Sequence, residues 1–401
     1  MAFKMLDGNG AAVEAIKMAR VKVISAYPIT PQSSISEKLS ELVVNKELDA
    51  EYVRVESEHT AMSVATTAQL TGVRAATATS SVGLALMHEI LGLTSGCRVP
   101  IVMPVVNRAL VSPWSLWCDH SDAMAERDTG WLQFYANNVQ DVYDLTIMAY
   151  KTAENEKVLL PVMVCLDGFF LSHSMQKVNI PEQSEIDKFL GEYKPKNAYL
   201  TTEDPMFIND LQPPEDFTEL KYQHAMAIEN SFDVINEVMA DFNNTFGRKS
   251  SIIEEYLIDD ADAVLITMGS MSGTAKYTIN QMRSKGFKVG LMRIVVFRPF
   301  PYNRIKEALK GKKVVGVLDR SVSLGSQGGA VCLEVRSALK DSDTDVRQYI
   351  GGLGGRDISE STIKKIFEEL LEIKEGKSDK HSTWIDVKGN AMNLREVLKL
   401  V

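Results

Sequence analysis

The sequence predicts an α/β protein built from two layered domains, each around a mainly parallel sheet. Short apolar runs alternate with segments of helical periodicity, which is the pattern of strand–helix units. The alternation stops after about residue 170 and restarts near residue 259. A length of 401 residues also exceeds what one hydrophobic core usually holds. We therefore expect a first domain over residues 1–249, with a C-terminal excursion and linker, and a second over residues 250–401.

The first domain should contain a sheet that is covered on both faces. Helical spacing predicts helices at residues 10–19, 60–70, 82–91 and 139–154. Apolar runs predict strands at residues 21–26, 74–79, 99–106 and 159–166. Strands that alternate with helices pair in parallel, and continuously apolar strands fit a sheet between two helical layers.

A proline-rich stretch separates the two domains. Its prolines are Pro181, Pro195, Pro205, Pro213 and Pro214, and a helix is predicted after them at residues 225–243. This stretch indicates a connection between domains or a surface wrapped onto a partner. Beyond it we expect strands at residues 263–268, 289–295 and 313–318, with a helix after the first of them that runs through residue 284.

Composition excludes several classes of protein. The net charge of -9 argues against a nucleic-acid partner, which needs a clustered basic surface. The apolar runs are too short to span a bilayer or form a signal peptide, so we expect a cytoplasmic protein with no membrane contact. The cysteines are Cys97, Cys118, Cys165 and Cys332. No pair has the two-residue gap typical of metal or iron–sulfur ligation, so we expect no such site in this chain.

Three candidate site residues follow predicted strands. Thr30 lies in a turn stiffened by Pro28 and Pro31, where its hydroxyl suits recognition of a small anion. The alternative is a purely structural role, in which a proline turn is followed by a helix cap from Ser33 or Ser34. Arg108 follows another strand, and a guanidinium matches a carboxylate, although a single arginine there is often a surface residue.

Glu58 is the third candidate, at the start of a small-residue helix beside Glu56 and His59. Acidic residues at a helix start complement the helix dipole, which gives both glutamates a structural explanation. A closely approached ligand is the alternative, because a carboxyl in such a pocket has a raised pKa and can pass protons. The carboxyl ends of parallel strands share one sheet edge, so Thr30, Glu58 and Arg108 together favour a ligand site there more than any one of them does alone.

Two further segments keep open interpretations. The aromatic and acidic loop at residues 114–122 could be a lid or a subunit contact. Asp119 and His120 within it could bind a metal, but two ligands without a third are weak evidence. The turn at residues 269–273 could cradle a phosphate or be a tight strand-to-helix turn, and it lacks the P-loop signature.

Taken together, these motifs resemble the 2-oxoacid:ferredoxin oxidoreductase family over almost the whole chain and in the expected order. Four motifs resemble the family's pyrimidine-binding domain: Tyr27-Pro28-Ile29-Thr30-Pro31, Glu56-Ser57-Glu58-His59, Asn107-Arg108-Ala109 and Asp167-Gly168-Phe169-Phe170. Three further motifs resemble the transketolase-C-terminal-like domain that follows it: Gly269-Ser270, Arg298-Pro299-Phe300-Pro301 and Leu318-Asp319-Arg320. The first signature is fairly specific, whereas the others are weaker singly.

The resemblance implies an alpha subunit that oxidatively decarboxylates pyruvate to acetyl-CoA and CO2. Thiamine diphosphate would be the cofactor, coenzyme A the acyl acceptor and ferredoxin the electron acceptor. Glu58 matches the family's glutamate at N1′ of the aminopyrimidine, and Thr30 and Arg108 match positions that hold the substrate carboxylate. Tyr27, Pro28 and Ile29 would line the cofactor site beside Glu58.

The chain departs from a complete enzyme of this class. It has no Gly-Asp-Gly motif with a spaced asparagine and no ferredoxin-like cysteine runs. Both absences fit a complex in which a beta subunit carries the diphosphate, Mg2+ and a proximal cluster. Gamma and delta subunits, or a fused chain, would carry the remaining [4Fe-4S] clusters, and the active site would lie between subunits.

The substrate and two other functions stay open. Oxalate-using relatives look to carry arginine at the position of Thr30, and residues 119–122 and 127–131 resemble the pyruvate type. Both features favour pyruvate over oxalate, but 2-oxobutyrate and 2-oxoglutarate remain alternatives. A lipoamide-linked thiamine dehydrogenase beta-type subunit would share the plan but not residues 27–31. A non-catalytic assembly subunit would have no need of Thr30, Glu58 and Arg108 together.

Overall fold

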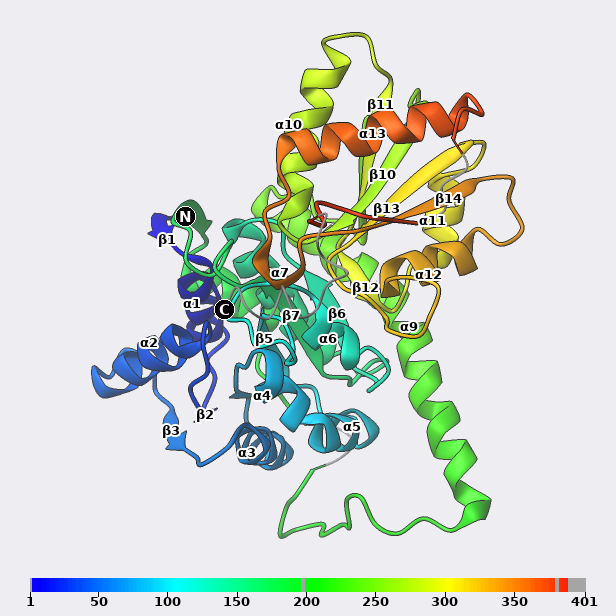
Figure 1. Ribbon diagram of the computed structural model, residues 1–401. Coiled ribbons are helices and arrows are strands. Elements are labelled where there is room, and N and C mark those ends of the chain that lie inside the picture. The colour runs from blue at the N-terminus through cyan, green and yellow to red at the C-terminus, as the bar shows by residue number, and fades with distance from the viewer. Residues whose placement is uncertain (1, 196–198, 379–381, 389–401) are drawn as a thin grey trace.

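Two large sheets organise the chain, as predicted. The computed structural model describes residues 2–195, 199–378 and 382–388. The strands of the first sheet are β2 (Val23–Ala26), β3 (Glu51–Arg54), β4 (Ala75–Ala76), β5 (Val102–Asn107), β6 (Leu132–Tyr135), β7 (Val162–Asp167) and β12 (Val296–Arg298). Their spatial order is β12-β6-β7-β5-β4-β2-β3 (Figure 1).

Parallel pairing in this first sheet determines where a site can form. β2, β3, β4, β5, β6 and β7 all pair in parallel, and only β12 runs antiparallel, against β6. The carboxyl ends of β2, β3, β5 and β7 therefore meet at one edge, where open α/β sheets bind ligands. Because β12 comes from the second half of the sequence, that half contributes a strand to the first sheet.

Helices cover the first sheet largely where periodicity predicted them. They are α1 (Gly8–Met18), α2 (Ser33–Val44), α3 (Glu58–Leu70), α4 (Ser81–Leu86), α5 (His88–Gly96), α6 (Ser121–Ala125) and α7 (Val139–Ala153). The single helix predicted at residues 82–91 is wrong, because a turn at Met87 separates α4 from α5. The strand predicted at residues 74–79 is shorter, since only β4 and an isolated bridge between Thr79 and Val105 form.

The second sheet has the order β15-β14-β13-β10-β11-β9. Its strands are β9 (Ile253–Tyr256), β10 (Ala263–Met268), β11 (Val289–Ile294), β13 (Val314–Asp319), β14 (Asp345–Ile350) and β15 (Ser382–Trp384), and only β9 is antiparallel. Its helices are α10 (Met271–Arg283), α11 (Tyr302–Ala308), α12 (Ala330–Ala338) and α13 (Glu360–Lys374).

Alternation along β10 shows that both faces of this second sheet are buried. Leu265 belongs to the apolar cluster that includes residues of α10 and α13. Its neighbours Val264 and Ile266 point the other way, into the cluster that includes residues of α11 and α12. Successive side chains of a strand face opposite sides, so the sheet is sandwiched between two helical layers. The predicted class of two layered parallel-sheet domains is thus confirmed.

The excursion between the sheets contains its own elements. β1 (Ala2–Leu6) pairs antiparallel with β8 (Gln176–Ile180), and α8 (Gln183–Leu190) follows. α9 (Pro214–Phe246) is 33 residues long and begins well before the predicted residue 225. Pro214 at its first position, with Glu215 and Asp216 in its first turn, supplies the start signals. No helix in the described part of the chain combines the length and apolarity that crossing a membrane requires.

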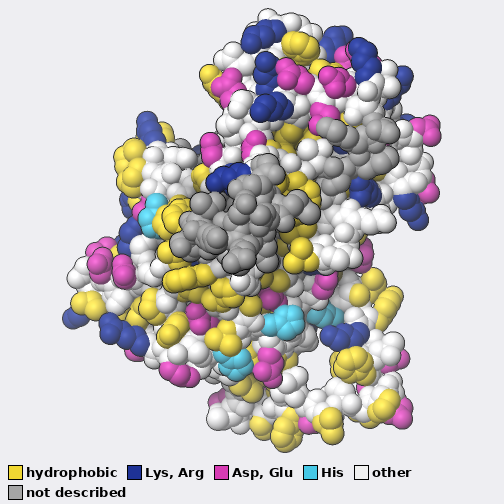
Figure 2. Space-filling view, viewed as in Figure 1, with side chains coloured by type: hydrophobic (Ala, Val, Ile, Leu, Met, Phe, Trp, Pro, Cys, Tyr) yellow, Lys and Arg dark blue, Asp and Glu magenta, His cyan; other side chains and the backbone are white. Residues whose placement is uncertain are grey.

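A projecting arm extends from the body of the molecule. It consists of residues 199–226, which include the first half of α9 (Figure 1). Phe207 and Leu211 on it are both 92% exposed, and Figure 2 shows apolar side chains along this lower edge of the surface. From Ala227 onward α9 becomes buried against the body.

Candidate active site

Glu58 occupies a buried position at the shared edge of the first sheet. Ser57 caps α3 by accepting a hydrogen bond from the Thr60 amide (3.2 Å), which places Glu58 in the first helical turn. The Glu58 residue is only 6% exposed. Burial raises the pKa of the Glu58 carboxyl, and a backbone hydrogen bond offsets part of this effect. Glu58 therefore retains a proton to a higher pH than an ordinary glutamate.

Glu56, the neighbouring acid, lies in a different environment. Its side chain is exposed and accepts a hydrogen bond from the Thr60 hydroxyl. That hydrogen bond lowers the pKa of Glu56. The fold thus separates the two acids that the sequence left side by side into a buried carboxyl of raised pKa and an exposed carboxyl of lowered pKa.

Gly83 in α4 faces the Glu58 carboxyl at very short range. A Cβ at residue 83 would lie 2.5 Å from Glu58 Oε1 and 2.7 Å from Thr79 Oγ1. The Thr79 hydroxyl is buried here and has no hydrogen-bond partner among the described residues. Gly83 therefore lets the Glu58 carboxyl and the Thr79 hydroxyl lie closer to α4 than any residue with a Cβ would, a contact that the sequence analysis missed.

Replacing Gly83 by alanine should reduce activity far more than stability. The added methyl would push the Glu58 carboxyl aside, and a misplacement of this size costs roughly 10- to 100-fold in rate. Because the displaced atoms belong to the side chains of Glu58 and Thr79 and not to the backbone, we expect a loss of no more than about 1–3 kcal/mol in unfolding free energy. Gly92→Ala is the matched control, since a Cβ on that helical glycine meets nothing within 4 Å. Equal turnover in the two variants would contradict the close approach.

Arg108 and Thr30 lie together at the same edge. Arg108 directly follows β5 and is 4% exposed. Its Nη1 donates to the Thr30 carbonyl (2.8 Å) and its Nε to the Ser115 carbonyl (3.0 Å). No residue in the described part of the chain accepts a hydrogen bond from Nη2, so that nitrogen is available to an anion. Thr30 itself is exposed, beside the guanidinium.

The turn that carries Thr30 is fixed from behind by Asn9. This fully buried side chain donates from Nδ2 to the Pro31 carbonyl and to Ser34 Oγ, both at 2.8 Å. The alternative of a serine-capped helix is wrong, because the N-cap of α2 is Gln32 and no side chain caps it. Asn9 escaped the sequence analysis, although a polar residue between Gly8 and Gly10 in a buried helix was a usable signal.

The remaining predicted cofactor-site residues line the same turn. Tyr27 and Ile29 are half-buried, and Pro28 is exposed. The Ile29 carbonyl accepts a hydrogen bond from the Gln32 amide (2.7 Å), which closes the turn. Their predicted contact with a cofactor stays a prediction.

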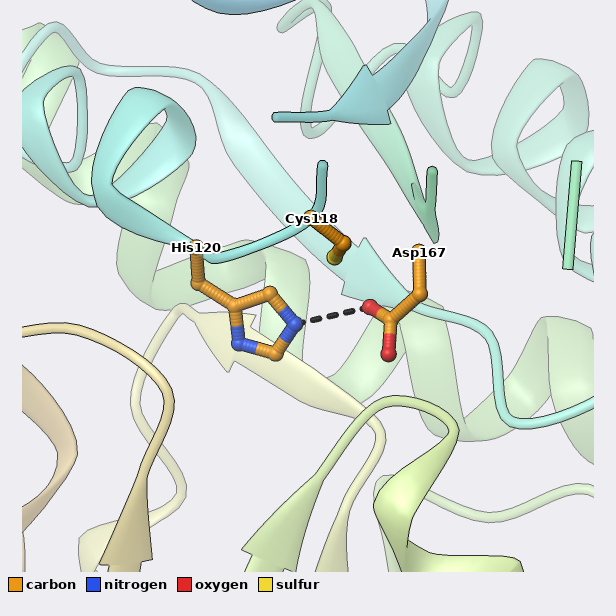
Figure 3. Close-up of side chains that lie close together, drawn as sticks. All are labelled: Cys118, His120 and Asp167. Atoms are coloured by element: carbon orange, nitrogen blue, oxygen red, sulfur yellow. Dashed lines mark hydrogen bonds and ion pairs between the residues drawn. The ribbon is translucent and has the colours of Figure 1, made fainter. Parts of the chain in front are cut away.

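Asp167, at the end of β7, joins the two sheets through a buried network. Its carboxylate is 2.8 Å from His120 Nε2 (Figure 3), and it accepts hydrogen bonds from the Ser270 amide (3.0 Å) and Arg320 Nη1 (2.6 Å). Burial alone would raise the pKa of Asp167, but the charges of His120 and Arg320 hold it well below its usual range. Ser270 and Arg320 follow β10 and β13, so this network spans both sheets.

The network also answers the two open questions about metal and phosphate. Cys118, His120 and Asp167 have ligand atoms within 4.8 Å of one another, a spacing that could hold an ion. Arg320 already places a positive charge on Asp167, and burial raises the pKa of the Cys118 thiol well above its ordinary value. The donors are thus better explained as an ion-pair network. The turn at residues 269–273, for which a phosphate site was one interpretation, already binds a carboxylate of the protein, because the Ser270 amide donates to Asp167.

Asp119 does not join His120 at a metal position. Its carboxylate accepts hydrogen bonds from the Ser121 amide (2.9 Å) and the Gly354 amide (3.1 Å). The hypothesis of an Asp119–His120 metal pair is therefore wrong. The loop of residues 114–122 is instead bonded to the second half of the chain. Besides the bond from Gly354 to Asp119, the His120 amide donates to the Arg320 carbonyl (2.9 Å).

Asp167→Asn should destabilise the protein by about 3–5 kcal/mol, because it leaves Arg320 buried without its counter-charge. The pKa of Asp167 is depressed by folding, so its contribution is present above the unfolded value of about 4 and is lost as pH falls below it. We expect the variant to show a smaller loss of stability on acidification than the wild type. Denaturant unfolding at neutral and acidic pH measures both effects, and parallel pH curves would contradict the assignment.

Comparisons with known proteins bear on this geometry. Residues 14–240 match the family model of the thiamine-diphosphate-binding domain of pyruvate flavodoxin/ferredoxin oxidoreductases, and residues 261–363 match core domain II of pyruvate:ferredoxin oxidoreductase. The pyruvate synthase subunit PorA of Methanocaldococcus jannaschii is 48% identical over 96% of this chain and 98% of its own. The chain belongs to the pyruvate flavodoxin/ferredoxin oxidoreductase family. The match to the thiamine-diphosphate-binding model includes Thr30, Glu58 and Arg108.

Other relatives carry different substrate names. The ketoisovalerate oxidoreductase subunit VorA of Pyrococcus abyssi is 44% identical over 96% of this chain and 98% of its own. A 2-oxoglutarate:ferredoxin oxidoreductase from Magnetococcus marinus has a TM-score of 0.72 at 19% identity, over 92% of this chain and 65% of that one. The latter shows the shared fold. The relatives thus agree on the family but differ in the 2-oxoacid that their names give.

Proposed function

We propose that this chain is the alpha subunit of a pyruvate:ferredoxin oxidoreductase. Its complex would convert pyruvate and coenzyme A to acetyl-CoA and CO2 and pass the electrons to ferredoxin. The observation that carries this proposal is the buried Glu58 carboxyl facing Gly83 at the sheet edge that also holds Arg108. A proton carrier and a carboxylate-binding cation are the two groups that decarboxylation of a 2-oxoacid requires from this side of a site.

The residues at this edge fit the aminopyrimidine of thiamine diphosphate. Gly83 lets the Glu58 carboxyl lie directly against α4, and the buried Thr79 hydroxyl beside it has no hydrogen-bond partner among the described residues. Thiamine diphosphate supplies the carbon nucleophile and electron sink for decarboxylation when it is bound. Glu58 holds the proton at N1′ of the pyrimidine, and its raised pKa keeps that proton to a higher pH than an ordinary glutamate would. Tyr27, Pro28 and Ile29 form the wall of the same site.

Arg108 and Thr30 bind the substrate carboxylate. The guanidinium is already oriented by the carbonyls of Thr30 and Ser115, so little side-chain freedom is lost on binding. Nη2 donates to the carboxylate, and the exposed Thr30 hydroxyl donates a second hydrogen bond. This arrangement orients the bond to the departing CO2 and keeps the charged end of the substrate at the edge.

The site is half of an active site. A beta subunit would supply the Mg2+ and diphosphate ligands and a proximal cluster, because this sequence has no Gly-Asp-Gly motif and no ferredoxin-like cysteine run. Gamma and delta subunits, or a fused chain, would carry further [4Fe-4S] clusters. Within this chain, residues 1–249 would form the pyrimidine-binding domain and residues 250–401 the transketolase-C-terminal-like domain.

Pyruvate is the preferred substrate in this proposal, with another 2-oxoacid as the second candidate. PorA and VorA relatives have similar identities to this chain, so overall similarity does not separate the two. The test is purification of the complex from its host and measurement of coenzyme-A-dependent viologen reduction with pyruvate, 2-oxobutyrate and 3-methyl-2-oxobutanoate. A kcat/KM highest for pyruvate supports the proposal. A preference for a branched 2-oxoacid would overturn the substrate assignment, and no activity with any 2-oxoacid would overturn the proposal itself.

A further inference from the structure

Asp122 in α6 is a buried carboxylate that the proposed mechanism does not use. It is 1% exposed, although it lies near the sheet edge. Four donors converge on it: the Ser81 amide (3.0 Å), the Arg108 amide (2.9 Å), Asn107 Nδ2 (2.8 Å) and the Ala123 amide (2.8 Å). Three of these donors come from other elements, so Asp122 joins segments that are distant in the sequence.

The joined segments carry the two halves of the proposed site. Ser81 is the first residue of α4 and has a φ of 50°, a left-handed conformation that costs energy for a residue other than glycine. That strained start sets the path of the short helix that brings Gly83 against Glu58. Arg108 is the proposed carboxylate-binding residue. One carboxylate oxygen, Oδ2, accepts hydrogen bonds from both the Ser81 and the Arg108 amides.

Two more hydrogen bonds close this junction. Ser81 Oγ donates to the Ala109 carbonyl (2.6 Å), and the Leu110 amide donates to Ser121 Oγ (2.9 Å). The segment just after Arg108 is thereby tied to α4 on one side and to the residue before Asp122 on the other. Asp122 contacts both backbone turns directly, through one carboxylate oxygen.

We propose that Asp122 is a positioning residue, whose carboxylate sets the separation between the Glu58–Gly83 wall and the Arg108 guanidinium. This inference rests on the proposed function. A carboxylate suits the task because all four partners are donors, and each of its two oxygens accepts two of them. An asparagine would turn an NH2 group toward two N–H donors in either orientation, which forces the turns apart.

The protonation of Asp122 is consistent with this role. Burial raises the pKa of Asp122 to about 6, while the hydrogen bonds from Asn107, Arg108, Ser81 and Ala123 oppose that rise. The carboxylate is therefore ionised at neutral pH, when all four donors need an acceptor.

The test compares Asp122→Asn and Asn107→Ala in the assembled complex with Asp144→Asn. Asp144 is also a buried carboxylate, but it pairs with Gln140 and Arg248 and does not contact either turn. The measurements are KM and kcat for pyruvate, thiamine diphosphate retained after gel filtration, and the thermal midpoint. We expect Asp122→Asn to raise KM about 10- to 100-fold and to lower cofactor retention, because displaced binding groups lose effectiveness steeply. Asp144→Asn should lower the midpoint and leave KM unchanged.

Asn107→Ala keeps the test decisive if Asp122→Asn fails to assemble. It removes one of the four donors and should raise KM in the same direction by a smaller factor. Unchanged KM and retention in both assembled variants would overturn the positioning role, as would a KM change in Asp144→Asn of equal size. Arg108→Ala, measured in parallel, distinguishes a failure of the positioning role from a failure of the proposed function. If it leaves KM unchanged for every 2-oxoacid, the proposed function fails and this inference fails with it.

Discussion

Glu58→Gln should lower kcat at least about 100-fold while the complex assembles normally, because a positioned proton carrier contributes 10²- to 10⁴-fold. Glutamine preserves the size and the hydrogen-bonding oxygen of the side chain, so the space opposite Gly83 stays filled as before. What it removes is the exchangeable proton that a carboxyl of raised pKa holds. The measurement is pyruvate-dependent viologen reduction, normalised to bound thiamine diphosphate.

Glu56→Gln is the matched control for that experiment. It makes the same chemical change two residues away, on a side chain that is exposed and bonded to Thr60. We expect turnover within about twofold of the wild type, since surface substitutions away from special features have small effects. Equal losses in both variants would indicate a general charge effect at the start of α3, and equal retention would remove Glu58 from the mechanism.

The raised pKa of Glu58 also fixes the direction of a pH effect. Burial disfavours the ionised carboxyl, so the protonated form persists to higher pH than in an exposed glutamate. A deprotonated Glu58 has no proton to place on N1′, and turnover should therefore fall as pH rises through this raised pKa. Glu58→Gln should lack that limb of the kcat profile, and a profile of unchanged shape in the variant would contradict the assignment.

Sequence reasoning located the proposed site because of one property of parallel sheets. Thr30, Glu58 and Arg108 each follow a strand or its connecting turn, and parallel strands of one sheet end at the same edge. The structure brings Thr30 and Arg108 into direct contact. It also buries Glu58 and exposes Glu56, a difference that helix-start signals do not encode because both acids suit the dipole equally.

The residues that sequence reasoning missed act through the backbone. Asn9 binds the Pro31 carbonyl, and Asp122 accepts the amides of Ser81 and Arg108. Contacts of this kind depend on which loops meet in space, and local periodicity carries no information about them. Gly83 was missed for a related reason, since its importance lies in the Cβ that it lacks.

The departures in the fold have similar causes. β12 pairs with β6 across more than 160 positions of sequence, so nothing near residue 296 indicates its partner sheet. β4 has only two residues because its pairing stops after Ala76 and resumes only at the bridge between Thr79 and Val105. The early start of α9 follows ordinary helix-start signals at Pro214, Glu215 and Asp216, which the proline-rich surroundings obscured.

Arg108→Ala should raise KM for pyruvate about 100-fold or more, because losing one member of a desolvated charge pair costs roughly 2–5 kcal/mol. The guanidinium is nearly inaccessible from bulk solvent and is held by the Thr30 and Ser115 carbonyls, so a bound carboxylate meets a preoriented donor. Arg108→Lys should recover only part of the loss, since an ammonium keeps the charge but cannot hold both carbonyls and the substrate in one plane.

Arg98→Ala supplies the control, because Arg98 also donates to backbone carbonyls, those of Val158 and Leu159, but precedes β5 instead of following it. It should lower the thermal midpoint and leave KM for pyruvate unchanged. The contrast separates substrate binding from the structural value of an arginine bonded to carbonyls. If both variants raise KM equally, Arg108 acts through stability alone, and the carboxylate of the 2-oxoacid must be bound by residues that the partner subunit supplies.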